Sequence, residues 1–332
     1  MRNNPFMPIY DLCNAGNSRQ KLETLPSFPR LMDIELTNTC NFRCLMCPTG
    51  NFSQKRPSGL MEPETFLKVA DEAAEHGTPL RFIRWGEPTM HPRFLEYVRA
   101  AKDRGLLVHV NTNGSYMTDE MIGELIEIPL DSLKFSFQGV DRVSYSEMRN
   151  RDYFIELVAT IRRFHGMRGD RAKPFLQVST TITYEAVQQV KDFTDEMKTM
   201  ADMVNVGHTT FDWLDLKAVR LKPHEIAMLE RLKGQESLNK IHPECPEVFD
   251  KLSINWDGKV TACCMDSDNL MIIGDIARQS LAEIWTSSKM REFREVLADM
   301  RHDDLPLCKN CYDSHGLAAN APKASDDGPG KA

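Results

Sequence analysis

Short apolar runs alternate with longer amphipathic segments over the first two thirds of the chain. The runs are rich in β-branched residues and suit buried strands, whereas the segments between them repeat their apolar residues at helical spacing. Several of those segments open with Pro, Asp or Thr, as helices do. The pattern predicts strands over 31–37, 80–84, 106–112, 132–137, 175–182 and 203–209, and helices over about 62–76, 92–104, 118–127, 152–165 and 185–200.

This alternation defines a fold class. Strands separated by helices pair in parallel through right-handed crossovers. The pattern therefore predicts an α/β fold, wound either as an open sheet or as a partial barrel. In both arrangements, ligand-binding groups gather at the carboxyl ends of the strands.

The pattern changes toward both ends of the chain. From about residue 245, KLSINW and KVTACC read as two strands joined by an Asp-Gly turn, and the helix-like SLAEIWTSSKMREFREVL follows, which predicts a small α+β module. We expect a polar, Pro-containing strap over 1–30, the α/β domain over 31–220, a linker and the second module over 221–315, and a disordered tail over 316–332.

Composition narrows the class of protein. The 332 residues are 41% hydrophobic and 27% charged, without an apolar run long enough to span a bilayer or a signal-like amino terminus, so we expect a cytoplasmic protein with no membrane partner. The net charge of -7 and the scattered Lys and Arg residues give no reason to expect nucleic acid binding. Reducing compartments keep thiols free, so the nine cysteines indicate metal ligation.

The first cysteine group, Cys40, Cys44 and Cys47, follows the first predicted strand in the segment TNTCNFRCLMCPTG. Three thiolates in a CxxxCxxC spacing can hold three irons of a [4Fe-4S] cluster and leave the fourth iron open. That iron can bind the methionine portion of S-adenosylmethionine, whose reductive cleavage gives a 5′-deoxyadenosyl radical. A zinc loop fits less well, because zinc usually takes four ligands in two close pairs.

The segment CNFRCLMCP resembles the signature of the radical S-adenosylmethionine (radical SAM) superfamily, and further matches follow in order. RWGEP resembles the GGEP motif of that family, with Trp85 in place of the first glycine. The resemblance implies that Gly86, Glu87 and Pro88 hold the amino group of the cofactor. It also implies that Asn113, in the segment NTNG, faces the cofactor cleft.

The same resemblance implies further cofactor contacts and the fold. KFSFQGVD resembles the ribose-contacting segment, with Ser136 and Gln138 as hydrogen-bonding residues. Arg149 lies where many relatives bind the cofactor carboxylate, with Arg151 as its competitor. Met46 occupies a position that is usually aromatic and packs near adenine, which a thioether can also do. The implied fold is a partial (β/α)6 radical SAM barrel.

The second cysteine group consists of Cys245, Cys263, Cys308 and Cys311. Four thiolates can ligate either a cluster or a zinc ion. The segment that contains them resembles the SPASM/twitch modules of radical SAM enzymes, which implies one auxiliary [4Fe-4S] cluster in the short, twitch form. Cys264 is then a buried thiol, a substitute ligand or a hydrogen-atom donor. We expect no role for Cys13.

Single-cluster twitch enzymes that the chain resembles include aminocyclitol and sugar dehydrogenases and epimerases. The resemblance implies hydrogen abstraction from a small polyol, sugar or aminocyclitol, followed by oxidation through the auxiliary cluster, or by epimerisation with Cys264 returning hydrogen. It implies an electron donor such as flavodoxin or ferredoxin. A peptide-modifying maturase and a non-catalytic iron–sulfur or zinc sensor remain alternatives. Candidates to bind hydroxyls or remove a proton are Glu185, His208, Asp212 and Asp215.

Overall fold

The computed structural model describes residues 2–211, 213–234 and 244–311. Its strands form one nine-stranded sheet in the order β6-β5-β4-β3-β2-β1-β7-β8-β9. The strands are β1 (Leu31–Ile34), β2 (Leu80–Phe82), β3 (Val108–Thr112), β4 (Ser132–Ser136), β5 (Phe175–Ile182), β6 (Met203–His208), β7 (Lys251–Ile254), β8 (Lys259–Thr261) and β9 (Ile272–Asp275).

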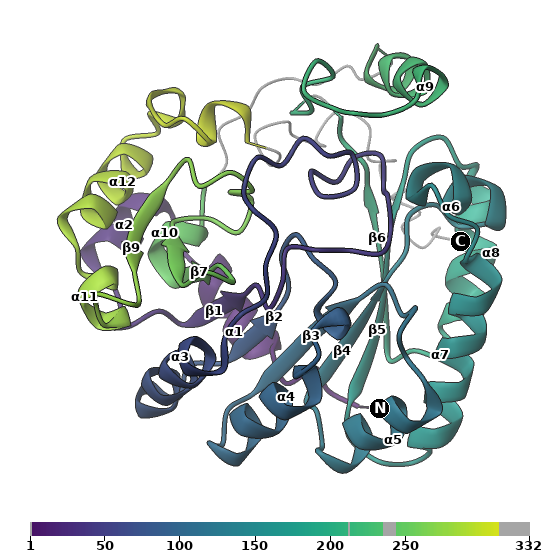
Figure 1. Ribbon diagram of the computed structural model, residues 1–332, viewed down its shortest axis with the longest axis horizontal. Helices are drawn as coiled ribbons and strands as arrows, with labels where there is room; N and C mark the ends of the chain where they lie inside the picture. Colours follow the sequence, from purple (N-terminus) through teal and green to yellow (C-terminus); the bar gives the residue numbers. More distant parts are fainter. Residues whose placement is uncertain (1, 212, 235–243, 312–332) are drawn as a thin grey trace, which may run out of the picture.

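Strands β1 to β6 pair in parallel with their neighbours in chain order. The intervening helices cover the outer face of this curved sheet, and the carboxyl ends of the strands point toward one open mouth (Figure 1). This arrangement confirms the predicted α/β partial barrel. The helices between these strands are α3 (Pro63–His76), α4 (Phe94–Asp103), α5 (Asp119–Glu127), α6 (Arg142–Arg149), α7 (Phe154–Arg168) and α8 (Val187–Met197). Helix α9 (Pro223–Gly234) follows β6 and lies apart from the sheet, on the side of the mouth (Figure 1).

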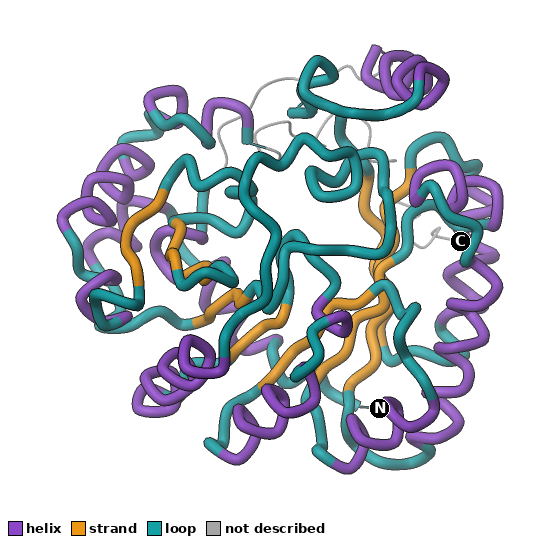
Figure 2. The backbone as a smooth tube through the Cα atoms, in the orientation of Figure 1, coloured by secondary structure: helices purple, strands orange, loops and turns teal. Residues whose placement is uncertain are grey.

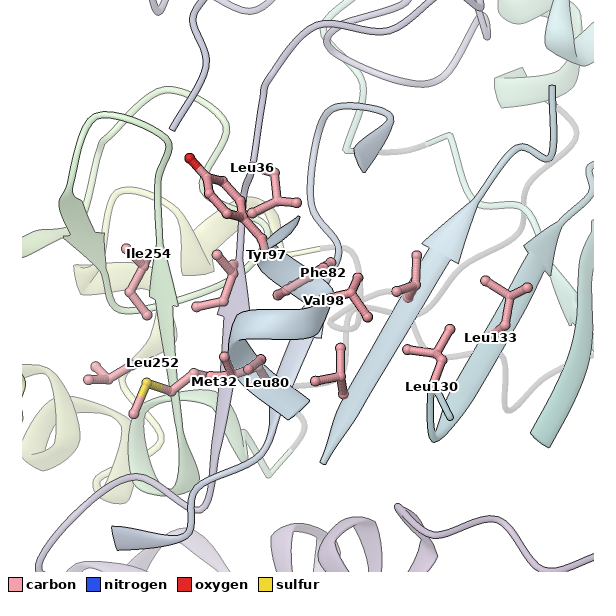
Figure 3. Packing of buried hydrophobic residues seen from close by; sticks show 14 of the residues in the cluster. Met32, Leu36, Leu80, Phe82, Tyr97, Val98, Leu130, Leu133, Leu252 and Ile254 are labelled. Carbon is pink, nitrogen blue, oxygen red and sulfur yellow. The ribbon is translucent and has the colours of Figure 1, made fainter. Parts of the chain in front are cut away.

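The two faces of the barrel strands have opposite character, as the two-residue period of a strand requires. Figure 3 shows Met32, Leu80 and Phe82 packed beside Val98 of α4 on the outer face, and all four are fully buried. Burying a side chain of this size contributes about 1.5–3 kcal/mol. The outer face therefore holds the hydrophobic core and fixes the strand ends that carry the site.

The inner face is polar and charged. Arg81 donates two hydrogen bonds to Asp33, at 2.6 and 2.8 Å, and neighbouring strands add His109 and Lys134. Burial is the main reason that the pKa of Lys134 falls to about 8, with a further contribution from Arg81. The same cause holds the pKa of His109 well below its ordinary value. The barrel thus encloses ionisable groups directly below its mouth.

The carboxy-terminal module continues the barrel sheet. Strand β7 pairs in parallel with β1, with Leu31 opposite Lys251, whereas β8 and β9 are antiparallel. Gly258 has a positive φ of 80° in the predicted Asp-Gly turn between β7 and β8. The predicted hairpin is therefore present, and its first strand is the seventh parallel strand of the sheet. The module's helical elements are α10 (Glu247–Asp250), α11 (Leu281–Trp285), α12 (Ser288–Ala298) and η3 (Cys308–Asn310).

The amino-terminal segment, expected as a strap, contains two short helices. It forms α1 (Met7–Asn14) and α2 (Ser18–Glu23), and α2 lies beside α12 in Figure 2. The Asn17 side chain caps α2 by accepting a hydrogen bond from the Gln20 backbone amide, and the Gln20 side chain accepts one from the Asn17 backbone amide. Lys21 pairs with Asp250 of the module. The segment thus fastens the module to the barrel.

Two further observations complete the fold. Within the part of the chain that the structure describes, no helix is long and apolar enough to cross a membrane. The predicted disordered tail over 316–332 lies outside the described residues.

Candidate active site

The loop after β1 carries the first three cysteines at the mouth of the barrel. The amide of Phe42 donates to Cys40 Sγ at 3.4 Å, and the amide of Cys47 donates to the Cys44 carbonyl at 3.1 Å. The loop then crosses itself tightly, since a Cβ atom on Gly50 would lie 2.4 Å from the Cys44 carbonyl oxygen. Glycine is required there because no side chain fits between the two backbone segments.

The GEP segment after β2 packs directly on that loop. A Cβ atom on Gly86 would lie 2.0 Å from the carbonyl oxygen of Thr37, and the amide of Glu87 donates to the Thr39 carbonyl at 2.9 Å. Pro88 begins a short 3-10 helix, η1 (Pro88–Met90). The close approach explains the glycine and brings the backbone of the segment to the cluster loop.

The carboxylate of Glu87 is buried and fully used within the protein. It accepts hydrogen bonds from the Thr112 hydroxyl at 2.7 Å, from the Asn113 amide at 2.7 Å and from Thr89. Burial is the largest influence and raises its pKa, while these hydrogen bonds act in the opposite direction. Glu87 therefore joins the ends of β2 and β3 rather than offering its carboxylate to a ligand.

Three other predicted cofactor residues converge from different elements. The Asn113 side-chain amide lies 2.9 Å from Asn41 Oδ1 and 3.8 Å from Cys40 Sγ. The Arg149 guanidinium donates to Cys44 Sγ at 3.5 Å and to the Ser136 carbonyl at 2.5 Å. Asn113 thus links the end of β3 to the cysteine loop, and Arg149 of α6 links that loop to the end of β4.

These groups line one cavity, which we call the barrel-mouth cavity, of about 190 Å³. Its position beside three thiols, an arginine and several amide groups suits a ligand that carries both a carboxylate and hydrogen-bonding groups. The lining includes every predicted cofactor residue except Pro88. It consists of Cys40, Cys44, Met46, Cys47, Ile83, Arg84, Trp85, Gly86, Glu87, Asn111, Thr112, Asn113, Ser136, Gln138 and Arg149.

The four cysteines of the second group surround another cavity, the four-cysteine cavity, of about 70 Å³. Its lining is largely apolar and includes Trp213, Met265, Met271 and Leu297. Burial is the leading cause that raises the pKa of the Cys308 thiol to about 12 and the pKa of the Cys245 thiol above its ordinary value. Ligands for a metal centre in such a site release their protons when the centre binds.

Sulfur spacing tests whether either cysteine set is compact enough for a single zinc ion. A zinc ion bonded to sulfur at about 2.3 Å in a tetrahedron needs sulfurs about 3.8 Å apart. Among the described residues, the only such group with ligand atoms within 4.8 Å of one another is Glu247, Cys263 and Cys264. Among the described residues, neither the three-cysteine nor the four-cysteine set is that compact, so their sulfur spacing does not match a single tetrahedral zinc ion.

Cys264 lies apart from the barrel-mouth cavity. Its side chain is grouped with Glu247 and with Cys263, whose pKa it helps to raise. It is absent from the lining residues of that cavity. Cys13 is buried in α1.

The remaining sequence candidates lie outside the barrel-mouth lining. Arg151 stacks over the ring of Phe42 and donates to the Asn41 carbonyl. Glu185 accepts the amides of Thr183 and Tyr184 before α8. Asp215 is exposed and accepts the Lys217 amide, and His208 is exposed at the end of β6. Asp212 lies outside the described residues.

The sequence did not predict a role for Arg84, and it marked Trp85 only as a replacement for the first glycine of the GGEP motif. Both line the barrel-mouth cavity, and Arg84 Nε and Trp85 Nε1 are buried without a hydrogen-bond partner among the described residues. Arg84 has a φ of 119°, a strained backbone region for a residue with a side chain that costs about 1–3 kcal/mol. The available signal was a cation at the end of the apolar run LRFIR.

The barrel, the three-cysteine loop and the four-cysteine module together define an iron–sulfur enzyme of the α/β partial-barrel class. The family model of the radical SAM superfamily matches residues 34–197, and that of the SPASM iron–sulfur cluster-binding domain matches residues 245–312. The chain belongs to the radical SAM superfamily and carries a SPASM-type domain. Its cofactors are therefore S-adenosylmethionine, a [4Fe-4S] cluster and auxiliary iron–sulfur ligation.

The chain is similar to proteins that are named for different reactions. The chain is 27% identical over 317 residues to the tungsten-containing aldehyde ferredoxin oxidoreductase cofactor-modifying protein of Pyrococcus furiosus, covering 84% of this chain and 86% of that protein. It is 24% identical over 283 residues to the PqqA peptide cyclase of Methylorubrum extorquens, covering 76% of this chain and 71% of that protein. The chain is thus similar along most of its length to proteins with different substrates.

Solved structures support the fold. BtrN in complex with AdoMet and 2-DOIA has a TM-score of 0.56 and 16% identity, covering 86% of this chain and 93% of BtrN. SuiB of Streptococcus suis bound to S-adenosylmethionine has a TM-score of 0.64 and 14% identity, covering 83% of this chain and 70% of SuiB. At these identities the likeness shows a common fold.

Proposed function

We propose that this radical SAM enzyme oxidises a hydroxyl-bearing carbon of a small polyol, sugar or aminocyclitol. The observation that carries the proposal is the four-cysteine cavity, in which four thiols converge in a largely apolar lining. A cluster held by four protein ligands has no open iron for substrate and is suited to accept an electron. The similarity to BtrN, whose structure holds 2-DOIA, supports this substrate class.

We assign the three-cysteine loop to the first cluster and the barrel-mouth residues to the cofactor. Arg149 would pair with the cofactor carboxylate, the backbone of Gly86 to Pro88 would accept its ammonium group, and Ser136 and Gln138 would bind the ribose. Asn113 would close the cleft beside Cys40, and Met46 would pack near adenine. When bound, the cluster and S-adenosylmethionine supply a 5′-deoxyadenosyl radical that removes a hydrogen atom from the substrate.

We assign Cys245, Cys263, Cys308 and Cys311 to a single auxiliary [4Fe-4S] cluster within a module over 221–315, following the barrel over 31–220. These four cysteines provide a complete ligand set. An electron donor such as flavodoxin or ferredoxin would reduce the first cluster. The sites thereby start and end the radical reaction.

The position of Cys264 favours oxidation over epimerisation. A hydrogen-atom donor must reach the substrate radical, and Cys264 faces Glu247 and Cys263 instead of lining the barrel-mouth cavity. We therefore assign it no hydrogen transfer. Oxidation needs only an electron acceptor and the loss of the hydroxyl proton.

Anaerobic reconstitution and turnover test the proposal. Two [4Fe-4S] clusters predict about eight irons per chain. With dithionite, S-adenosylmethionine and a panel of inositols, amino sugars and aminocyclitols, we expect 5′-deoxyadenosine and a ketone product in equal amounts. Ketone formation that persists in Cys264→Ala supports oxidation. Loss of an epimeric product in that variant, with deoxyadenosine retained, would establish epimerisation, and absence of any product from the panel would reject the substrate class.

A peptide-modifying activity is the second candidate. It is favoured by the similarity to the PqqA peptide cyclase over 76% of this chain. The same reconstituted enzyme, incubated with candidate precursor peptides, would then produce a peptide of lower mass. A mass loss in a peptide without turnover of any polyol would replace the first proposal.

A further inference from the structure

A single cationic side chain bridges the barrel-mouth cavity and the loop that follows Cys263. Arg84 lies two residues after the end of β2, is separated from the GEP segment by Trp85, and lines the cavity. Its positive φ of 119° would be free of strain in glycine. An arginine at this position costs backbone strain, which indicates that the side chain itself has a role. The contacts of its guanidinium indicate what that side chain does.

Both terminal nitrogens of Arg84 bind the carboxy-terminal module. Nη1 donates to the Thr261 hydroxyl at 3.0 Å, and Nη2 donates to the Asp266 carbonyl at 2.9 Å. The Thr261 hydroxyl in turn donates to the carbonyl of Cys263 at 3.2 Å. A two-bond chain therefore runs from the cavity wall to the backbone of a predicted cluster ligand.

The acceptor loop is itself firmly held. Asp266 is fully buried, and its carboxylate accepts the amides of Leu270 at 2.9 Å and Met271 at 2.8 Å. The loop from Cys263 to Met271 thus keeps a fixed shape. A displacement at Arg84 is passed to the whole loop, because packed and hydrogen-bonded segments move together.

The charge of Arg84 lacks a carboxylate partner in the described part of the chain. Two other arginines do have one, in the Arg81–Asp33 and Arg56–Glu35 pairs. A cation without a carboxylate partner, hydrogen-bonded through Thr261 to the backbone of a cluster ligand, favours the more negative, reduced state of that cluster and raises its potential.

We propose that Arg84 is a positioning residue that ties the loop after Cys263 to the wall of the barrel-mouth cavity. The Arg84 guanidinium therefore influences both the affinity of the barrel-mouth cavity for the cofactor and the redox potential of the cluster in the four-cysteine cavity. The inference rests on the proposed function, because it takes the four-cysteine cavity as the auxiliary-cluster site.

The test uses the full chain, reconstituted anaerobically, with two measurements on Arg84→Gly. The midpoint potential of the auxiliary cluster is measured by EPR titration in a background with Cys40, Cys44 and Cys47 all replaced by Ala. The dissociation constant of S-adenosylmethionine is measured by equilibrium dialysis with all cysteines intact. We expect a more negative potential and an affinity weaker by about tenfold or more, the size expected for loss of a charged hydrogen bond.

Matched variants separate positioning from general loosening. Thr261→Val removes one acceptor and should shift both quantities in the same direction by less, whereas Thr261→Ser should match the parent. Lys68→Ala is the control, since Lys68 also bridges barrel and module, by donating to the Gln279 carbonyl at 3.0 Å, and does so away from both cavities. It should leave both quantities unchanged.

An unchanged potential or an unchanged affinity in Arg84→Gly would overturn the inference, as would equal shifts in Lys68→Ala. If the parent shows no auxiliary-cluster signal at all, the proposed function fails first. A parent signal that Arg84→Gly leaves unaltered defeats only the inference.

Discussion

The two cysteine sites differ in what surrounds their sulfurs. The three thiols at the barrel mouth adjoin a cavity lined by two arginines and several amide and hydroxyl groups. The four thiols of the module adjoin a smaller cavity whose lining is largely apolar. Both sites sit on the same continuous sheet, because β7 pairs with β1.

The contrast teaches how one chain can divide a radical reaction. A site with three ligands and polar surroundings leaves room for a charged cofactor, whereas a site with four ligands in apolar surroundings exchanges electrons only. Removing a ligand from the first site should therefore stop 5′-deoxyadenosine formation, whereas removing one from the second should stop only formation of the oxidised product. The predictions below test that separation, beginning with the largest effect on the reaction.

Removing a ligand from the three-cysteine loop should abolish the reaction at its start. Cys44→Ala leaves two thiols in the loop, and we expect no detectable 5′-deoxyadenosine, with iron falling from about eight to about four per chain. Cys13→Ala is the matched control, because Cys13 is buried in α1, and it should retain both. Deoxyadenosine formation by Cys44→Ala would refute the assignment of the loop.

Removing a ligand from the module should stop the reaction at its end. Cys308→Ala should lose the oxidised product and about four irons per chain, while 5′-deoxyadenosine formation continues without it. Chromatography of both products from one reaction checks this. A parallel loss of both products, in a variant that still binds S-adenosylmethionine, would contradict a division of labour.

A methyl group on Gly86 should damage only the barrel-mouth cavity. Gly86→Ala forces Cβ to within 2.0 Å of the Thr37 carbonyl oxygen, so the GEP backbone must move. We expect S-adenosylmethionine affinity to fall by about tenfold or more, equivalent to about 1.4 kcal/mol. The auxiliary-cluster EPR signal should persist. Gly166→Ala, in open space on α7, is the control and should bind normally.

The last prediction concerns the charged barrel interior, away from both cysteine sites, and measures stability instead of the reaction. The pKa of Lys134 is lowered to about 8 from 10.5, so its protonated form destabilises the folded state fully below about pH 8, and this penalty disappears as pH rises through 10.5. Lys134→Met should therefore raise the free energy of unfolding by about 3 kcal/mol at pH 7 and by little at pH 10.5. Denaturant titrations at both pH values, with exposed Lys198→Met as control, would reject this if the gain were independent of pH.

Sequence periodicity located the six barrel strands because each is a local apolar run. The pairing of β7 with β1 could not be predicted from a local pattern, because the paired residues Leu31 and Lys251 are far apart in the chain. Helix α6 was missed because its segment RVSYSEMR is mostly polar and buries few side chains, among them Tyr145 and Met148. The helix α2 did carry a local signal, the Asn17 and Gln20 capping box.

The site residues, too, were predictable only where a local sequence motif marks them. Motif spacing identified both cysteine sets and the residues now found around the barrel mouth. It did not identify Arg84, because the partners of that side chain, Thr261 and Asp266, come from a distant segment. Nor did it reveal that the Glu87 carboxylate is fully used by internal donors such as Thr112. Such features depend on contacts that form only in the folded chain.

The most direct test of the central claim is ENDOR spectroscopy of the reduced protein with S-adenosylmethionine labelled with 15N in its amino group. We predict a 15N coupling to a cluster signal in the parent and in Cys308→Ala, and no coupling in Cys44→Ala. A coupling retained in Cys44→Ala, or lost in Cys308→Ala, would show that the cofactor does not bind at the three-cysteine site alone.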